Sequence, residues 1–402
     1  MMKRTFIVWC LGLFLLSSCA KYAEQPTLQQ PAYLRVFNDL NYVLGPSNST
    51  LPSNEITFLM DPVLDKTGLP TDAAVIGDYI TVRDTFAVSH PATAGNTGVT
   101  NQREWPGSLP VRTAPTINGL DLSSWAQVSS GKHRIMLMGR PLTDTPFLHL
   151  PASGRTTVIA DTTVELTAGE VYTLEAVIRD FATNATGAYI RQESFTHTPF
   201  SSLNNYLSFY CLSGNHLNPN NAVPFYGSSG AGSHFFPPLK LYYSLYTPVC
   251  SNTSSAGTYN YSCKFAPQLQ TVHVYFRSIT GDFAQSAPYD SLPQFPMSQY
   301  LNPDGTFAGE GNRPWVSIGV YDQLGGAASI DFDVSPGRMP SLPFPLPGLE
   351  TPTFPFGNGL AIATSNSQRI TIYPSVNIVE LINGNPYIIQ LHRTFDAPII
   401  TN

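Results

Sequence analysis

Charge is scarce in this chain. Only 12% of its 402 residues are charged, about half of the share that is usual in soluble domains. The formal net charge is −6 and no basic cluster occurs, which argues against nucleic acid or an anionic membrane surface as a partner. Hydrophobic residues still make up 42% of the chain and aromatic residues 12%, so the sequence can bury a sizeable core.

Motifs for nucleophilic or metal-dependent catalysis are missing as well. The sequence has no GxSxG pattern, and its eight histidines show no HExxH spacing. No CxxC or Cys/His spacing indicates zinc. We therefore expect a protein that is not an enzyme and uses no metal or cofactor. Two alternatives stay open: His216 and His234 could hold a metal across a loop, and Asp331 and Asp333, on one strand face, could act as acid and base.

Long apolar runs are rare, and the first one is short. Lys3 and Arg4 precede an apolar run over 6–16, which leads into Leu16-Ser17-Ser18-Cys19. A spanning helix needs about 20 residues, whereas a positive head, an apolar core and a small-residue cut site define a secretory signal. The ending resembles a bacterial lipobox. That resemblance implies a signal peptide over 1–18 and a lipoprotein anchored to the outer membrane by diacylation of Cys19; which side of the membrane it faces stays open.

Cysteine is rare, with five in the chain. Cys10 would leave with the signal and Cys19 would carry the lipid. The other three, an odd number in an oxidising compartment, are Cys211, Cys250 and Cys263. A Cys250–Cys263 disulfide, which would close a small loop rich in Ser, Thr, Asn, Gly and Tyr, is the preferred pairing. Cys211 lies in an aromatic, strand-like run, and we expect it to be a buried thiol.

Short alternating, β-branched and aromatic runs fill the rest of the chain, separated by Gly, Pro, Asn and Asp. Typical runs lie at 33–37, 56–60, 79–83 and 315–321. No segment holds a long helical period. The sequence therefore predicts an all-β fold built of sandwiches of the immunoglobulin-like or transthyretin-like kind.

An internal repeat indicates two copies of one module. The segment 164–172 (VELTAGEVY) recurs at 379–387 (VELINGNPY), and both copies read as strand, tight turn with glycine, strand. The runs at 33–37 and 206–210 also agree. We predict a lipidated tether over 19–31, a first sandwich domain over 32–199 and a second, with long loops, over 200–402.

Four motifs of the first half resemble a known family: 34–38 (LRVFN), 56–61 (ITFLMD), 131–135 (GKHRI) and 166–173 (LTAGEVYT). They are similar to an uncharacterised β-sandwich domain, often tandem, of Bacteroidetes cell-surface lipoproteins, a domain of unknown function. These motifs are strand and turn signatures, so the resemblance transfers no site. A weaker resemblance is to fimbrillins, two-domain pilus subunits that are matured by cleavage after an arginine. Here the first arginine after the lipobox, Arg35, lies inside an expected core strand.

The second half carries the longest insertions, over 213–238 and in the proline-rich run 335–357. Aromatic rings exposed on a β scaffold can stack on sugars or anchor a protein. We expect Phe225, Tyr226, Phe235 and Phe236 to form the ligand-binding surface, because glycine and serine surround them. The predicted function is a non-enzymatic, lipid-anchored bacterial envelope protein that binds a glycan or a protein. The alternative is a fimbrillin-like subunit or adhesin of a surface fibre.

Overall fold

The computed structural model of the chain consists almost entirely of strands, so the predicted all-β fold is confirmed. It describes residues 28–40, 55–83, 86–87, 104–107, 109, 111–180, 185–200, 205–212, 239–255, 258–267, 274–279, 285–286, 290–292, 315–322, 327–333, 365–366, 369–372, 375–382 and 385–392. The helical turns among these residues are three short 3-10 helices, η1 (Phe147–His149), η2 (Ala152–Arg155) and η3 (Ser194–Thr196). None of the helices in these ranges is long and apolar enough to cross a membrane.

Two sheets make up the first half of the chain. The outer sheet has the strand order β3-β2-β7-β8, with β2 (Glu55–Leu64), β3 (Pro70–Thr81), β7 (Gly131–Arg140) and β8 (Val158–Leu166). The central sheet has the order β10-β9-β1-β5, with β6 also on β1; its strands are β1 (Ala32–Asn38), β5 (Glu104–Trp105), β6 (Ala126–Val128), β9 (Val171–Asp180) and β10 (Ala185–Gln192).

Two further sheets come mainly from the second half. The third sheet has the order β15-β11-β21-β22-β4, with β16 also on β11; its strands are β4 (Phe86–Ala87), β11 (Asn205–Leu212), β15 (Gln285–Ser286), β16 (Asp290–Leu292), β21 (Ser375–Ile382) and β22 (Asn385–His392). The fourth sheet has the order β13-β12-β17-β18, with β14 also on β12; its strands are β12 (Leu239–Ser255), β13 (Thr258–Pro267), β14 (Val274–Ile279), β17 (Trp315–Asp322) and β18 (Ala327–Asp333). A small separate ladder joins β19 (Ser365–Asn366) to β20 (Arg369–Ile372).

The two halves share one topology. In the first half, β1 pairs in parallel with β9, and β9 pairs antiparallel with β10. In the second half, β11 pairs in parallel with β21, and β21 pairs antiparallel with β22. The outer and fourth sheets also match strand for strand, since β3-β2-β7-β8 corresponds to β13-β12-β17-β18. This agreement supports two copies of one module. The boundary at residue 200 stays a prediction, and β4, from the first half of the chain, belongs to the third sheet.

The sequence repeat aligns segments that are not equivalent in the fold. In the first copy, β8 lies in the outer sheet and β9 in the central sheet, so the turn at Gly169 (φ +81°) crosses between sheets. In the second copy, β21 and β22 form a hairpin within one sheet, paired up to Ile382 and Asn385. The topology makes β9 the counterpart of β21, so the repeat is shifted by one strand.

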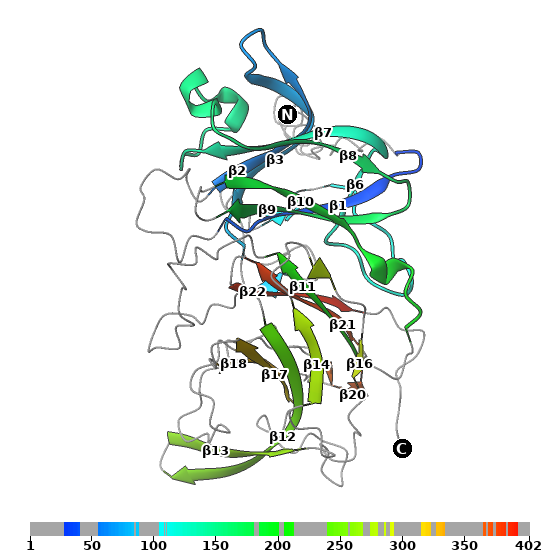
Figure 1. The fold of residues 1–402 in the computed structure, drawn as a ribbon, viewed down its shortest axis with the longest axis vertical. Helices are drawn as coiled ribbons and strands as arrows, with labels where there is room; N and C mark the ends of the chain where they lie inside the picture. Colours follow the sequence, from blue (N-terminus) through cyan, green and yellow to red (C-terminus); the bar gives the residue numbers. More distant parts are fainter. Residues whose placement is uncertain are drawn as a thin grey trace, which may run out of the picture.

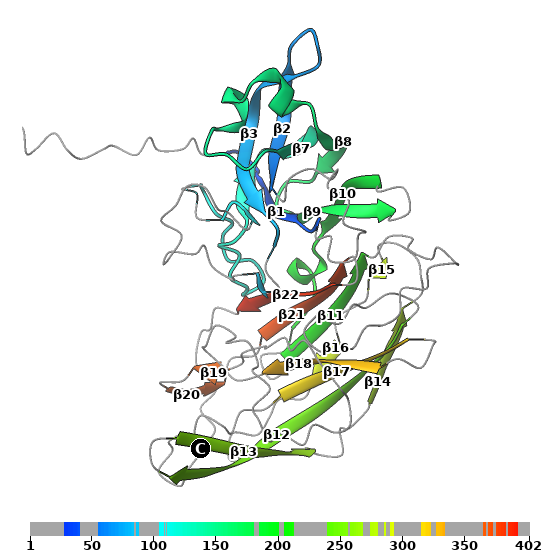
Figure 2. The same cartoon turned by 90° about the vertical axis from the view of Figure 1, so that its left-hand side faces the viewer.

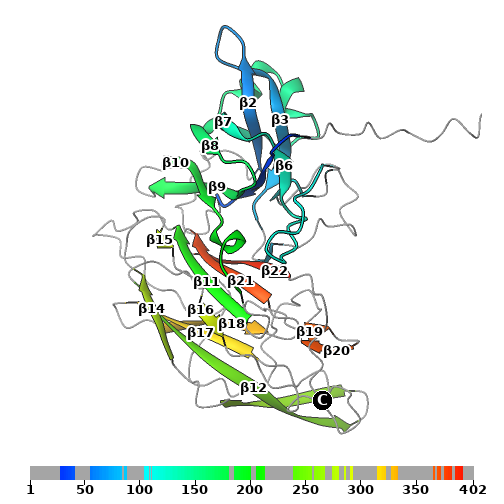
Figure 3. The ribbon, with the colours of Figure 1, turned by 90° about the vertical axis from the view of Figure 1, so that its right-hand side faces the viewer.

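The sheets are stacked along the long axis of the molecule, as Figures 1 and 2 show. The outer and central sheets enclose a core to which β1 contributes Leu34 and Val36, both 0% exposed. On its other face the central sheet packs against β11, β21 and β22 of the third sheet, an arrangement also visible in Figure 3. The central sheet is therefore buried on both faces.

Candidate functional site

The contact between the central and third sheets follows from strand alternation. Successive side chains of a strand point to opposite faces, so the residues of β1 that do not face the outer sheet, Tyr33, Arg35 and Phe37, face the third sheet. The apolar part of this interface is one cluster of buried residues from both halves: Tyr33, Phe37, Ala114, Leu120, Leu122, Trp125, Val171, Phe195, Tyr206, Tyr210, Val376, Ile378, Ile389 and Leu391. A second, smaller cluster joins Val177 to Leu212, Ile382 and Tyr387.

Charged side chains occupy the interface beside these clusters. Glu380 of β21 accepts hydrogen bonds from two arginines of the first half, Arg83 through Oε2 and Arg191 through Oε1. Arg191 also donates to Glu175 at 3.0 Å and to Glu193 at 2.9 Å. All five side chains are at most 5% exposed. We call these residues, together with Asp39, the ionic cluster.

Local backbone structure positions Arg83 at the crossing between the sheets. The chain leaves β3 at Thr81, Val82 forms a parallel bridge with Asn38 at the end of β1, and the Arg83 amide donates to the Asn38 carbonyl at 3.0 Å. The Arg83 guanidinium then lies 3.6 Å from Asp39 and 3.9 Å from Glu175. Arg83 thereby connects carboxylates of β9, β21 and the residue that follows β1.

Aromatic rings surround the two guanidinium groups of the ionic cluster. Arg83 lies 3.9 Å from the ring centre of Phe37 and 4.8 Å from that of Tyr387, and Arg191 lies 4.3 Å from that of Tyr210. A cation over an aromatic face is attracted by the ring quadrupole, and the attraction is stronger when water is excluded. Because Tyr210 and Tyr387 belong to the third sheet, these contacts also join the two halves.

Burial dominates the electrostatics of the ionic cluster. Desolvation raises the pKa of Asp39 to about 7 and raises the pKa of Glu175 well above its ordinary value; it also raises the pKa of Glu193. Burial acts on Glu380 in the same direction, but Arg191 and Arg83 outweigh it and hold the pKa of Glu380 below the ordinary value. Among these carboxylates, the arginines therefore stabilise the charged form of Glu380 most.

A second buried pair lies in the central sheet. Arg35 of β1 contacts Glu104 of β5 at 2.8 Å, and its guanidinium lies 4.6 Å from the Phe37 ring and 5.1 Å from the Trp125 ring. Burial lowers the pKa of Arg35. Arg35 is 0% exposed, so the departure from the fimbrillin pattern that the sequence indicated agrees with its position in the fold.

Most of the site residues that the sequence predicted are not in the ionic cluster. Cys19, Phe225, Tyr226, Phe235 and Phe236 lie outside the described residues, as do His216 and His234. Cys211 is a buried cysteine of β11 that forms no disulfide, as expected.

The preferred cysteine pair falls within one strand ladder. The register places Cys250 of β12 directly opposite Cys263 of β13, and the disulfide itself stays a prediction. Asp331 and Asp333 lie two residues apart on β18, at register positions opposite Ser317 and Trp315. Groups of three or more potential metal ligands do not occur in the ranges described above.

Sequence reasoning missed the ionic cluster. Arg35, Glu175, Arg191 and Glu380 each alternate with apolar residues along a strand, and that pattern also fits a strand whose polar face meets water. A usable signal was present: arginines are few, yet several fall within aromatic and β-branched runs.

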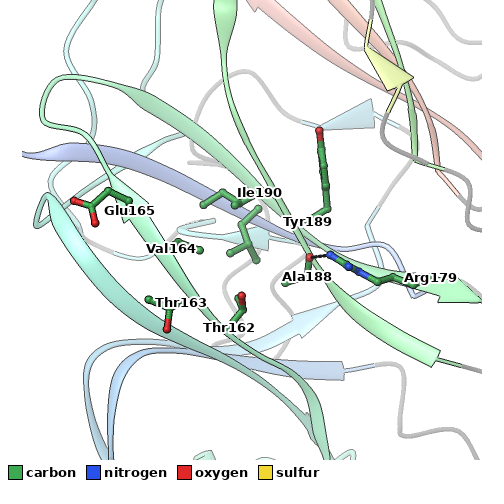
Figure 4. Close-up of a pocket in the computed structure, with 9 residues that line it drawn as sticks. Thr162, Thr163, Val164, Glu165, Arg179, Ala188, Tyr189 and Ile190 are labelled. Carbon is green, nitrogen blue, oxygen red and sulfur yellow. Dashed lines mark hydrogen bonds between the residues drawn. The ribbon is translucent and has the colours of Figure 1, made fainter. Parts of the chain in front are cut away.

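A pocket of about 390 Å³ lies where the edges of the first sandwich meet, between β8 and β10. Figure 4 shows Arg179 reaching across to β10. Its Nη2 donates to the Ala188 carbonyl at 2.6 Å, and Gly187 leaves room for this crossing, since an added Cβ would lie 2.6 Å from Arg179 Nε. The Thr186 hydroxyl donates to the Ile159 carbonyl of β8 at 2.9 Å. On each of the two edge strands, β8 and β10, a side chain is therefore hydrogen-bonded to a backbone carbonyl.

Asp61 of β2 organises a polar arrangement on β7. Its carboxylate lies 2.7 Å from His133 Nδ1 and accepts from the Arg134 amide at 3.0 Å. Arg134 in turn makes two hydrogen bonds to Asp161. His133 Nε2 is buried and has no hydrogen-bond partner among the described residues.

No family model matches the chain, and no curated protein matches it. Solved structures do match the chain, and two of them are "putative cell adhesion" proteins. A "putative cell adhesion protein" from Bacteroides eggerthii is 7% identical, with 92% of this chain and 98% of that chain covered and a TM-score of 0.16. A second protein so described, from Bacteroides fragilis, is 12% identical, with 91% and 100% covered and a TM-score of 0.14. Likeness at this level carries no argument about fold or function.

Proposed function

We propose that the protein is a lipid-anchored protein of the bacterial envelope that acts by binding and not by catalysis. In this proposal Cys19 holds it to the outer membrane, and the loops around Phe225, Tyr226, Phe235 and Phe236 bind a glycan or a protein partner. The supporting observation is the sealed contact between the two halves. The apolar clusters and the ionic cluster join the two halves. In this proposal the joined halves hold the binding surface away from the membrane.

The first strand gives the proposed tether a firm attachment. The Gly169 amide donates to the Pro31 carbonyl at 2.8 Å, and the Tyr33 amide donates to the Glu170 carbonyl at 2.9 Å. The chain is therefore hydrogen-bonded into the fold from Pro31 onward. A pull on the tether acts on β1, which pairs with β5, β6 and β9 in the central sheet.

Two observations favour a binding protein over the fimbrillin-like subunit. Arg35 is buried in β1, where a protease cannot reach it without unfolding the sheet. A fibre that grew by strand addition at the β8 and β10 edges would have to displace the Arg179 and Thr186 side chains from the carbonyls they hold. The fibre subunit stays the second candidate.

Lipid attachment can be tested with two cysteine variants in bacteria grown with a palmitate analogue that carries a clickable tag. We expect the wild type and Cys10→Ala to be labelled and Cys19→Ala to be unlabelled. Label retained on Cys19→Ala would refute the anchor. Protease treatment of intact cells then reports which side of the membrane the protein faces.

Binding can be tested by replacing Phe225, Tyr226, Phe235 and Phe236 together with alanine. Leu142→Ala is a matched control, because Leu142 is a large apolar residue that is 71% exposed in the first half. On an array of envelope saccharides and in crosslinking to envelope proteins, we expect the fourfold variant to lose at least tenfold in affinity and the control to bind normally. Equal binding by both variants would exclude these aromatic residues.

A further inference from the structure

The two sheets that meet between the halves present equivalent faces. Each sheet has a row of an aromatic residue, a glutamate and a tyrosine, placed opposite one another across three corresponding strands. The first row is Phe37 of β1, Glu175 of β9 and Tyr189 of β10, and the second row is Tyr210 of β11, Glu380 of β21 and Tyr387 of β22. The register of the strands thus makes the two rows structural counterparts.

Other counterparts of the two halves lie together in the buried interface. The same register relates residues of β1 and β9 to residues of β11 and β21, and both members of each pair belong to one apolar cluster. These pairs are Tyr33 and Tyr206, Val171 and Val376, and Val177 and Ile382. A contact in which the same patch of both partners meets is isologous, and it is the arrangement of two-fold dimers.

The arginines of the ionic cluster follow this symmetry but not its origin. Arg83 lies 3.9 Å from the ring centre of Phe37 in the first row and is hydrogen-bonded to Glu380 in the second. Arg191 lies 4.3 Å from the ring centre of Tyr210 in the second row and contacts the glutamate of the first row at 3.0 Å. In these ion pairs the first half supplies both arginines and the third sheet supplies a carboxylate. A third sheet therefore fits a central sheet better than it fits another third sheet, because two buried carboxylates would repel each other.

We propose that two copies of this chain pair by exchanging halves, so that the central sheet of each copy packs against the third sheet of the other. Every contact between the halves is then the same as in the single chain, and only the connection between them changes its path. Exchange of identical elements is a low-cost route to a dimer for this reason. The inference concerns the body of the protein and does not depend on what its loops bind.

The connection between the halves is held close to both of them. Asn118 Nδ2 donates to the carbonyls of Phe195 at 2.9 Å and of Thr198 at 2.7 Å, which fixes η3 to the first half. The ring of Phe200 already lies 4.6 Å from that of Tyr206 in the third sheet. The chain therefore passes from contacts with one half to contacts with the other within a few residues, and short connections of this kind favour exchange.

The strand β4 would exchange together with the first half. Phe86 and Ala87 pair in parallel with Ile388 and Ile389 of β22. In the exchanged dimer the same pairing joins β4 of one copy to β22 of the other, which adds backbone hydrogen bonds between the chains. Because β22 comes last in chain order among the strands described here, the choice of partner is made late in folding, and the concentration of chains decides it.

The first test refolds the full chain from urea as a mixture of two preparations with different affinity tags. We expect dimers that carry both tags, and the ratio of dimer to monomer should rise about tenfold when the refolding concentration rises tenfold. Chains that are refolded separately and then mixed are the control and should stay unpaired, because exchange requires the halves to separate. Absence of mixed dimers at every concentration would overturn the proposal, as would equal pairing in the control.

The second test identifies the surfaces that pair. Chains with Val177→Cys are refolded together with chains that carry Ile382→Cys, and a disulfide between these two positions should link the two chains in peptide maps. The two substitutions in one chain, refolded in dilute solution, show that the positions can be bridged, and Leu142→Cys in place of Val177→Cys should give no link, since Leu142 is exposed. Dimers without this interchain disulfide, from positions that bridge within one chain, would mean that another surface pairs.

Discussion

The carboxylate of Glu380 is hydrogen-bonded to the guanidinium of Arg191, and both groups are buried. The two residues belong to different halves of the chain, so this ion pair exists only when the halves are in contact. Buried ion pairs stabilise a structure little relative to apolar residues, but breaking one is costly. The pair therefore fixes how the halves are aligned more than how strongly they adhere.

Replacing Glu380 with glutamine should destabilise the protein strongly. Arg83 and Arg191 would lose the carboxylate that both of them contact, and uncompensated charge would stay buried. We expect a loss of about 3–5 kcal/mol in the free energy of unfolding, measured by urea denaturation. Asp161→Asn, which breaks the partly exposed pair with Arg134, should cost less than about 1 kcal/mol. Similar losses of stability for the two variants would show that the ion pairs of Glu380 gain nothing from their burial in the interface.

Gly77 should not tolerate even a methyl group. A Cβ at this position of β3 would lie 2.6 Å from Cδ1 and 2.8 Å from Cγ of Trp105. The Trp105 ring is 2% exposed and lies 5.2 Å from the Phe58 ring, so it has little room to move. We expect Gly77→Ala to lower the free energy of unfolding by about 1–3 kcal/mol.

Gly154→Ala is the matched control for that substitution. The nearest atom to a Cβ at residue 154 is Leu150 Cβ at 3.4 Å, an ordinary contact. Its effect should stay within about 0.5 kcal/mol. A stable Gly77→Ala protein would mean that the Trp105 ring can shift.

The register of β12 and β13 makes the cysteine prediction directly testable. Mass spectrometry of a non-reduced digest should recover the peptides of Cys250 and Cys263 linked together, and alkylation of the unfolded, non-reduced protein should leave Cys211 labelled. Cys250→Ser together with Cys263→Ser should cost about 3 kcal/mol, as for a closed loop of roughly 15 residues. Full alkylation of Cys250 without reduction would rule the bridge out.

Arg179 should protect the β10 edge from other chains. Replacing it with alanine removes the donor to the Ala188 carbonyl and exposes an unpaired acceptor on an edge strand. We expect little change in stability, about 1 kcal/mol or less, but more self-association in sedimentation velocity. Arg134→Ala, which removes an exposed arginine of β7, should remain as monodisperse as wild type. Identical sedimentation of all three proteins would show that Arg179 does not protect this edge.

Strand alternation predicted the all-β class correctly but could not reveal the third layer on the central sheet. Leu34 and Val36 alternate with Arg35 in the same way whether the arginine meets water or another sheet. The distinction depends on which face the second half covers, and that is a property of the assembled sheets. For the same reason Glu175, Arg191 and Glu380 could not be grouped from their spacing.

The repeat illustrates a different limit. It led to the prediction of two copies of one module, and the strand orders of the two halves are compatible with that prediction. Its two copies nonetheless fall on different strands, β8–β9 and β21–β22. A strand, a glycine turn and a strand form a common local solution, so similarity of that length reports local geometry and not position in the fold.

The short strand β4 has a consequence for how the chain is made. Phe86 and Ala87 pair in parallel with Ile388 and Ile389 of β22, which comes last in chain order among the strands described here. During synthesis, this early segment meets its partner only after almost the whole chain has emerged. A fragment that begins at residue 200 would lack an edge of its own sheet. The two halves are thus interlocked and have to fold as one unit.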